Sequence, residues 1–285
     1  MMRSMFAAIS GLKAHQVMLD VTAADIANVN TLGYKASRMT FRDSLSQMQR
    51  GGGAATTATG GTNASQVGLG AQVGSVDVNM VGGALQTTGN PLDVALSGEG
   101  WFRVGPSNGG TPAAPGVPTA IQYTRAGNWT TNDQGFLVTS DGLYVVGRNA
   151  TATGPGTTDI TINIPPGSTN LSIGQDGSVS YQPSGGGARV TAGYISLAKF
   201  ANQNGLERNG SNTWTAGANA GAPQVGTPGQ GGVYGITASG AVEMSNVDLA
   251  AEFTNMITAQ RGFQANSRII STADQMLADL VNLIR

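Results

Sequence analysis

The sequence offers few residues for acid–base chemistry, and its one histidine is His15. A serine–histidine–aspartate triad would need its general base at this position. His15 lies in an N-terminal stretch whose spacing predicts a helix, far along the chain from the strand-rich middle. We therefore interpret His15 as a solvated helix residue rather than a catalytic base.

The acidic residues give no firmer catalytic pattern. Asp93 and Glu99 flank a predicted strand and turn and could serve as the paired carboxylates of a glycosidase. Closeness along the chain does not set the separation of two carboxyl groups, so we interpret them as a solvated pair and keep a β-sandwich glycosidase as a remote alternative. Segment 132–135 and the Asp-Gly pairs at 141 and 176 lack the alternating Asp series of a calcium loop, and we interpret them as hairpin turns.

Composition excludes further classes of function. The chain has no cysteine, which rules out a thiol nucleophile, disulfides and thiolate zinc sites. Its formal net charge of -1 provides no basic field for nucleic acid. The glycines at 51–53 and 98–100 lack the sequence context of a phosphate loop. We predict no enzyme activity, no catalytic, cofactor-binding or metal-binding residues, and neither nucleic acid nor a small-molecule substrate as a partner.

The clearest pattern in the chain is the C-terminal segment 245–285. Ser245 and Asp248 have the spacing of a helix N-terminus, in which a hydroxyl caps the first turn and a carboxylate follows. Apolar residues then recur in steps of three, four or seven, which predicts one long helix with coiled-coil spacing. These residues are Leu249, Phe253, Met256, Phe263, Ile270, Leu277, Val281 and Ile284.

The N-terminal segment 1–30 repeats the pattern. Its heptad seam is Met5, Ile9, Leu12, Gln16, Leu19, Ala23 and Ile26. We expect the two terminal helices to pair as an antiparallel or crossing hairpin. One partner covers only one stripe, so a second apolar stripe on the C-terminal helix is expected to bind other subunits. The apolar faces need neighbours, so we expect both helices to be largely disordered in the monomer.

Between the terminal helices the chain is rich in turns and alternating strands. Asn28 and Gly33 predict a defined turn after the first helix. Residues 31–72 are predicted to form an arm and a linker, of which the low-complexity tract 50–66 is expected to be flexible. Residues 73–244 predict an all-β outer domain. The fold class is therefore α+β, with paired long terminal helices of coiled-coil type bracketing an all-β middle domain.

Several stretches together resemble the bacterial flagellar rod and hook axial proteins. At the N-terminus the resemblance lies in 26–35, Ile-Ala-Asn-Val-Asn-Thr-Leu-Gly-Tyr-Lys, and at the C-terminus in 240–249 and 260–268. The middle agrees at 88–102 and 123–128. One departure is Ala24-Asp25, where the family usually has two asparagines. The resemblance spans nearly the whole chain, and the two terminal motifs are specific together.

The resemblance implies a structural subunit that self-assembles into a helical tube, with the terminal helices inside and the β-domain outside. Segments 243–248 and 280–285 most resemble hook subunits, which predicts a curved universal joint between rod and filament. The alternative is a distal rod subunit, and a remote alternative is an extracellular adhesin or fibre protein. We expect subunit contacts at these residues: Met5, Ile9, Leu12, Leu19, Ile26, Asn28, Gly33, Leu249, Phe253, Met256, Phe263, Ile270, Leu277 and Ile284.

The same resemblance implies a location and a set of partners. The partners are further copies of the chain, the distal rod protein, the hook cap, the hook–filament junction proteins and the flagellar type III export apparatus. The expected location is the hook and basal body, outside the cytoplasmic membrane. No apolar run approaches the ~20 residues that span a bilayer, and the start lacks a small-residue cleavage site, so we expect export without a cleaved signal peptide.

Overall fold

The computed structural model describes residues 2–55, 60–111, 114–151 and 154–283. The α+β class predicted from the sequence is confirmed, because a helix stands at each end of a strand-rich middle. The chain divides into two compact units. The helical unit comprises Met1–Ala27, Ser37–Asn79 and Asp248–Arg285, and the β unit comprises Asn28–Ala36 and Met80–Val247.

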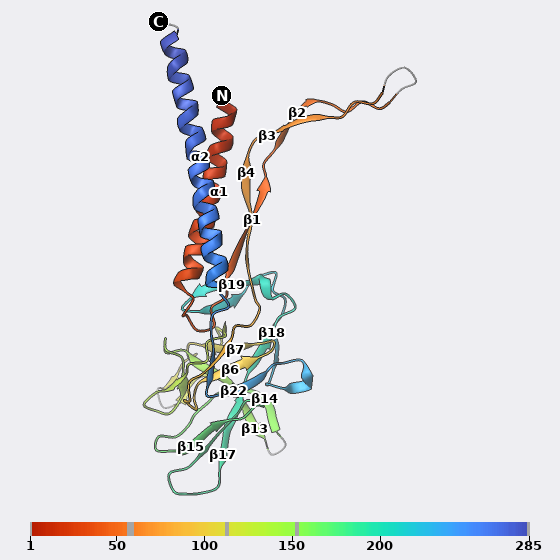
Figure 1. The fold of residues 1–285 in the computed structure, drawn as a ribbon. Helices are drawn as coiled ribbons and strands as arrows, with labels where there is room; N and C mark the ends of the chain where they lie inside the picture. Colours follow the sequence, from red (N-terminus) through yellow and green to blue (C-terminus); the bar gives the residue numbers. More distant parts are fainter. Residues whose placement is uncertain (1, 56–59, 112–113, 152–153, 284–285) are drawn as a thin grey trace. The chain divides into compact units, whose positions relative to one another are not determined.

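The helical unit contains both helices and the first four strands. They are α1 (Met2–Ala27), β1 (Ser37–Asp43), β2 (Ser46–Arg50), β3 (Ser65–Gly68), β4 (Ala71–Val78) and α2 (Leu249–Leu283). The two helices lie side by side, with the start of α1 and the end of α2 at the same end of the pair (Figure 1). The two helices are therefore antiparallel, which is one of the two arrangements expected from the sequence.

The N-terminus of α2 is capped by a different residue from the one predicted. The Asp248 carboxylate accepts hydrogen bonds from the backbone amides of Ala250 (2.9 Å) and Ala251 (3.3 Å), which is the geometry of an N-cap. The hydroxyl of Ser245 instead accepts a hydrogen bond from the amide of Val247 (3.2 Å). The helix begins one turn later than the Ser-x-x-Asp spacing indicated, because a carboxylate at the cap satisfies two amides at once.

On α2, apart from Asn255 and Gly262, the described residues that are at least half-buried follow a heptad spacing. They are Glu252, Met256, Ala259, Phe263, Asn266, Ile270, Ala273 and Leu277. Every seventh position, starting from Met256, is a large apolar residue that the sequence identified. The positions between them are small or polar, and Ala259 and Ala273 are buried. A seam that alternates large and small residues allows a close approach of the partner helix.

On α1 the observed seam coincides with the predicted one only in part. Ile9, Gln16 and Ala23 of the predicted seam are exposed. Met5, Leu12, Leu19 and Ile26 of that seam are half-buried. A second set at heptad spacing is also at least half-buried, and it consists of Ala8, Gly11, His15, Met18, Thr22 and Asp25. A Cβ on Gly11 would lie 2.9 Å from the Asn266 amide nitrogen, and one on Gly262 would lie 2.5 Å from the His15 ring. Glycine on one helix thus accommodates a polar side chain of the other.

The four strands of the helical unit form two antiparallel ladders. β1 pairs with β4 from Ser37↔Val78 to Asp43↔Ala71, and β2 pairs with β3. The second hairpin extends the ribbon begun by the first (Figure 1). The Ser10 hydroxyl accepts a hydrogen bond from the Ala71 amide (3.2 Å), and the His15 ring packs on the Phe41 ring at 5.3 Å, so α1 contacts the first ladder.

Beyond Arg50 the chain enters the low-complexity tract. An isolated bridge between Gly53 and Thr62 continues the β2–β3 pairing toward the middle of this tract. Residues 56–59 lie outside the described residues, so the expected flexibility of the tract stays a prediction. The two ends of the tract belong to a hairpin rather than to an unpaired linker.

The strands of the β unit are short, and each of their described ladders is antiparallel. Their bounds are β5 (Leu85–Thr87), β6 (Val94–Ser97), β7 (Trp101–Gly105), β8 (Gly110–Thr111), β9 (Ala114–Pro115), β10 (Gln122–Thr124), β11 (Thr130–Thr131), β12 (Leu137–Val138), β13 (Tyr144–Thr151), β14 (Gly154–Thr161), β15 (Thr169–Ile173), β16 (Ser178–Gln182), β17 (Val190–Ile195), β18 (Leu197–Lys199), β19 (Leu206–Gly210), β20 (Thr213–Ala216), β21 (Gln224–Gly226), β22 (Ile236–Ser239) and β23 (Ala241–Glu243). Two single-turn 3₁₀ helices, η1 (Gln203–Gly205) and η2 (Gln230–Gly232), lie among them.

The largest sheet of this unit has the path β15-β16-β17-β13-β7-β10-β20-β19, with β11, β12, β14, β18 and β21 paired beside it. Two smaller ladders, β6–β22 and β5–β23, join the start of the unit to its end. The core contains large apolar residues that are almost completely buried: Val94, Phe102, Val104, Trp129, Leu137, Val145, Ile162, Val179, Ile195 and Leu197.

The turn chemistry of the β unit was predictable. The three segments interpreted as hairpin turns connect β11 to β12, β12 to β13 and β15 to β16. In each, a glycine amide closes the turn on a carbonyl three residues earlier, as in Gly135 to Asn132 at 3.0 Å. All three glycines have positive φ, which explains why glycine follows Asp or Gln there.

Candidate assembly surfaces

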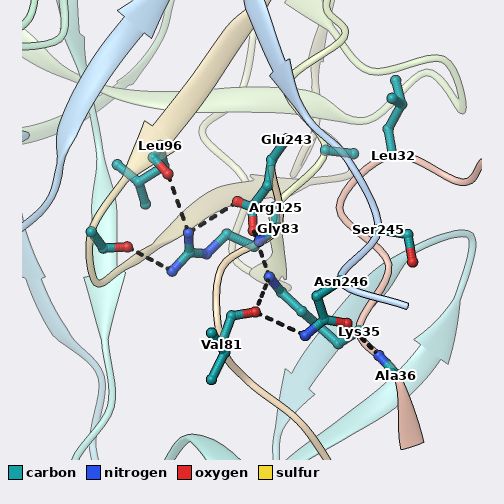
Figure 2. Close-up of polar contacts among 12 residues, drawn as sticks. Leu32, Lys35, Ala36, Val81, Gly83, Leu96, Arg125, Glu243, Ser245 and Asn246 are labelled. Atoms are coloured by element: carbon teal, nitrogen blue, oxygen red, sulfur yellow. Dashed lines mark hydrogen bonds and ion pairs between the residues drawn. The ribbon is translucent and has the colours of Figure 1, made fainter. Parts of the chain in front are cut away.

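Three chain segments far apart in the sequence meet in the β unit around the carboxylate of Glu243. Lys35 comes from the segment after α1, Arg125 from the turn after β10, and Glu243 ends β23. We call these three residues the Glu243 cluster, and all three side chains are buried. Figure 2 shows them converging, with Lys35 Nζ at 2.5 Å and Arg125 Nη1 at 3.0 Å from the two carboxylate oxygens.

Backbone groups complete the cluster. The amide of Gly83 donates to Glu243 Oε1 (3.0 Å), and Lys35 also donates to the carbonyl of Val81 (3.0 Å). The second guanidinium nitrogen of Arg125 donates to the carbonyl of Gly98 (2.9 Å), and the guanidinium lies 5.4 Å from the centre of the Trp101 ring. The charges are thus held by fixed hydrogen bonds, which a buried ion pair needs to offset its desolvation.

The cluster holds two cations against one anion. Burial lowers the pKa of Lys35, the Glu243 carboxylate opposes that shift, and the nearby Arg125 adds to it. Loss of Glu243 would leave both cations buried and unpaired, whereas loss of Lys35 would leave one balanced pair. The carboxylate is therefore the member on which the arrangement depends most.

Asn246 ties the segment before α2 to backbone groups of two other segments. Its side-chain oxygen accepts a hydrogen bond from the Ala36 amide (2.7 Å), and its side-chain nitrogen donates to the Val81 carbonyl (2.9 Å), both visible in Figure 2. The Gly33 amide donates to the Glu243 carbonyl at 2.7 Å. The segment that follows α1 and the segment that precedes α2 are thus fastened to each other inside the β unit.

The expected contact residues Asn28 and Gly33 both lie in this turn. The side-chain oxygen of Asn28 accepts from the Thr31 hydroxyl (3.0 Å), and its carbonyl accepts from the Thr31 amide (3.0 Å). Gly33 has φ +66°, and a Cβ there would come within 2.8 Å of the Ala126 backbone nitrogen. Only glycine fits this position, so Gly33 has a structural role within the chain.

The remaining expected contact residues divide into two groups. Met5, Leu12, Leu19, Ile26, Met256, Phe263, Ile270 and Leu277 are half-buried within the helical unit. Ile9, Leu249 and Phe253 are exposed. Ile284 lies outside the described residues. The half-buried side chains are largely used for contacts within the chain, whereas the exposed side chains are not.

Other large apolar residues are also exposed on the helical unit. On the helices they are Phe6, Ile257, Ile269, Met276, Leu280 and Val281, and on the strands and their turns they are Phe41, Leu45, Met48, Val67, Leu69 and Val76. Phe6 is 65% exposed and Leu45 is 76% exposed. Apolar residues in this number on a single small unit are unusual for a protein that remains monomeric.

The residues considered for catalysis are each engaged elsewhere. Asp93 accepts hydrogen bonds from the Thr88 hydroxyl (2.6 Å) and the Asn90 side chain (3.2 Å), and Glu99 pairs with Lys199 at 2.5 Å. His15 is not solvated as the sequence suggested, because its ring packs against Gly262 of α2 and the Phe41 ring. Among the described residues no group of three or more His, Asp and Glu side chains could hold a metal ion. Neither described helix is long and apolar enough to cross a membrane.

The Glu243 cluster was not predicted as a site. Its members occur at positions 35, 125 and 243, and nothing in their local spacing links them. The available signal was that each lies in a different stretch of the family resemblance. A lysine, an arginine and a glutamate in three separate motifs of a chain with only 11% charged residues could have been suspected as an ion-pair network.

Comparison with known proteins gives matches at both ends and in the middle. Three family models match: "Flagella basal body rod protein" at residues 5–35, "Flagellar hook protein FlgE/F/G D1 domain" at 95–181, and "Flagellar basal body rod FlgEFG protein C-terminal" at 238–283. The first and third include Lys35 and Glu243, and the second includes Arg125.

Curated relatives cover the whole chain. The flagellar basal-body rod protein FlgG of Bacillus subtilis is 46% identical over 286 residues, which is 100% of both chains. FlgG of Caulobacter vibrioides is 38% identical over 97% of each chain. The flagellar hook protein FlgE of Borreliella burgdorferi is 27% identical over a 441-residue alignment that covers 99% of this chain and 100% of that protein.

Proposed function

The chain belongs to the family of flagellar basal-body rod and hook proteins, and on that premise we propose that it is a structural subunit of the distal rod. The observation that carries the proposal is the end-to-end match to rod proteins named FlgG, at 46% identity and without a large gap. The hook protein is less similar, and its alignment is 441 residues long against 285 residues in this chain. The comparisons therefore favour the rod alternative over the hook predicted from the end segments.

We propose that the helical unit forms the inner tube of a helical homopolymer and the β unit its outer layer. In terms of the sequence-based division, segments 1–30 and 245–285 would be internal and 73–244 external. This assignment accounts for the apolar residues exposed on α1 and α2, since a neighbouring copy would cover them. It also gives a use for the Glu243 cluster, which fastens together the segments leading to the two helices.

The arm formed by β1 to β4 would then contact a neighbouring subunit. Leu45, Met48 and Val67 give its strands an apolar surface, and a two-stranded ribbon is marginally stable by itself. In a rod, the 50–66 tract would act as a stiffener between copies. In a hook it would act as an adjustable joint.

The proposed partners follow from a position in the distal rod. They are further copies of this chain, the hook protein above the rod and the flagellar type III export apparatus, through which the chain would pass unfolded and without a cleaved signal. The hook cap and the hook–filament junction proteins would be partners only of a hook subunit. The proposed role is structural and includes no enzymatic step.

The rod and hook proposals are separated by electron microscopy of basal bodies. Cells lacking the gene are compared with wild-type cells in which the protein is labelled with immunogold. The distal rod proposal expects truncated rods in the deletion strain and label beneath the outer boundary of the envelope. A complete rod that lacks a hook, with label on the curved segment, would contradict it and restore the hook prediction.

A further inference from the structure

A hollow of about 470 Å³ lies in the β unit beside the Glu243 cluster, and we call it the Arg125 hollow. Part of its wall is apolar, since Val81 and Leu85 line it and are 67% and 46% exposed. Backbone at Gly82 and Gly98 forms another part, and the Arg125 side chain also lines it. The volume is in the range of sites that hold small molecules.

The guanidinium of Arg125 has donors that the chain does not use. Its Nη1 donates to Glu243 Oε2 (3.0 Å) and to the carbonyl of Leu96 (3.5 Å), and its Nη2 donates to the carbonyl of Gly98 (2.9 Å). Its Nε is buried and has no hydrogen-bond partner among the described residues. A guanidinium has five N–H groups, so Nε–H and one N–H of Nη2 remain without an acceptor there.

These two nitrogens form one edge of the planar guanidinium. Two N–H groups on such an edge match the two oxygens of a carboxylate, and this bidentate pairing is among the stronger hydrogen-bonded contacts in proteins. A buried N–H without an acceptor costs free energy, so a carboxylate at this edge would also remove a cost that the chain now carries.

The charges around the hollow favour an anion. The Glu243 cluster holds Lys35 and Arg125 against one carboxylate. The acid at the rim, Glu99, pairs with Lys199 at 2.5 Å, so its charge is matched by a cation next to it. The hollow therefore lies beside an excess of positive charge, which attracts a single negative group.

We propose that the Arg125 hollow binds a small carboxylic acid in its ionised form. The carboxylate pairs with the Nε–Nη2 edge of Arg125, and a short apolar group lies against Val81 and Leu85. Nε is covered in this conformation, so the ligand reaches it through a small displacement of the wall. Gly82 is suited to that displacement, because apart from its chain neighbours a Cβ there would meet only Glu243 Oε1, at 3.8 Å.

This site is separate from the proposed function. Every residue named in it belongs to the β unit, and binding is a property of the single chain that can be measured without a rod. A ligand in the hollow would add a contact to the cluster that fastens the segment after α1 to the segment before α2.

The test is isothermal titration calorimetry of the purified full-length chain at pH about 7, where a carboxylic acid is ionised, with the ionic strength held constant. Isovalerate should bind saturably, with a dissociation constant of about 1–10 mM for a ligand of this size. Acetate keeps the carboxylate but lacks the apolar group, and it should bind several times more weakly. Isovaleramide keeps the shape without the charge, and it should not bind measurably.

Variants of the wall and of its charges sharpen the test. Gly82→Val narrows the hollow and should weaken isovalerate binding by about tenfold. Lys35→Met removes a cation that does not line the hollow and should weaken binding several-fold. Glu99→Gln leaves Lys199 unpaired at the rim and should tighten binding. Asp141→Asn, in a turn that does not line the hollow, is the control and should bind like the wild type.

The tryptophan unfolding transition shows whether each variant is folded, and an unfolded Gly82→Val leaves the decision to the three ligands and the two charge variants. The absence of saturable isovalerate binding would overturn the proposal, as would equal binding of isovalerate and isovaleramide. Wild-type affinity in Gly82→Val, Lys35→Met and Glu99→Gln alike would place the binding elsewhere on the chain and overturn it too. Immunogold labelling of basal bodies tests the proposed function separately, because the titration uses unassembled protein.

Discussion

The two units bury opposite kinds of side chain. In the β unit the most buried residues are large and apolar, and they include Trp101, Phe102 and Trp129. In the helical unit the most buried residues are small or polar, such as Ala8, Thr22 and Ala273, while Phe253 and Val281 are 50% and 65% exposed. The β unit therefore has a complete core of its own. The helical unit has many of its large apolar residues on the outside, where other copies of the chain would cover them.

This difference suggests that the two units have different roles in the proposed polymer. A unit with a complete core keeps its shape whether or not neighbours are present. A unit whose apolar surface is unfinished gains its main stabilisation on assembly, and assembly is thereby coupled to its folding. Substitutions can separate the two behaviours, because all three tryptophans, at 101, 129 and 214, belong to the β unit and report on it alone.

The largest effect on the β unit is expected from Glu243→Ala. Removing the shared carboxylate leaves Lys35 and Arg125 buried without their anion, which should cost about 3–5 kcal/mol of unfolding free energy. The cost should appear as a lower urea midpoint of the tryptophan fluorescence transition. A loss below about 1 kcal/mol would show that the cluster does not stabilise the β unit.

Two further variants control for the loss of charge in the Glu243→Ala experiment. Glu99→Ala removes an ion pair whose partners are 59% and 28% exposed, and its effect should stay within about 1 kcal/mol. Lys35→Met leaves Arg125 and Glu243 as a balanced pair, so it should cost clearly less than Glu243→Ala. If Lys35→Met lowers the unfolding free energy as much as Glu243→Ala does, then the excess buried positive charge has no energetic consequence.

An intermediate effect, confined to the helical unit, is expected from Gly262→Val. A Cβ at this position would lie 2.5 Å from the His15 ring, so a larger side chain must separate α1 from α2. We expect a loss of about 2–3 kcal/mol in helix pairing, seen as a lower melting temperature of the circular dichroism signal of the helices. The tryptophan transition of the β unit should not move.

His15→Ala provides the matching test. In the double variant the space vacated by the imidazole should accept the valine, and the pairing should recover in a double-mutant cycle. Equal losses in Gly262→Val with and without His15→Ala would show that the two residues do not meet in the helix pair. The packing of His15 against Gly262 would then be wrong.

Much of the architecture followed from the sequence, for identifiable reasons. The family resemblance is confirmed, and the two helices were found because Met256, Phe263, Ile270 and Leu277 recur every seven residues. The hairpin turns were found because Asp-Gly and Gln-Gly favour positive φ at the glycine. In each case the signal is local and depends on residue type alone.

What the sequence did not reveal depends on contacts between distant residues. Part of the α1 seam was missed because Ala8, Gly11 and Thr22 give no apolar signal, although small residues are what a close helix pair requires. The cap of α2 was assigned to Ser245 because a hydroxyl and a carboxylate at this spacing are both acceptable caps. The Glu243 cluster joins residues from three parts of the chain, and its formation depends on the fold of the whole β unit.

The smallest effect on stability is expected from Phe253→Ser, which should impair assembly far more than it lowers the unfolding free energy. Phe253 is half exposed and contributes little to the core of the single chain, so the unfolding transitions should shift by no more than about 0.5 kcal/mol. In the proposed polymer the same ring is covered by a neighbour, and its loss should reduce incorporation into the basal body, measured by immunogold labelling and by motility. Gln264→Ala, on an exposed position of the same helix, should leave both readouts unchanged. Normal incorporation of the Phe253→Ser protein would mean that this face of α2 points to solvent in the assembly, and the exposed apolar residues of the helical unit would then need a different explanation from contacts between copies.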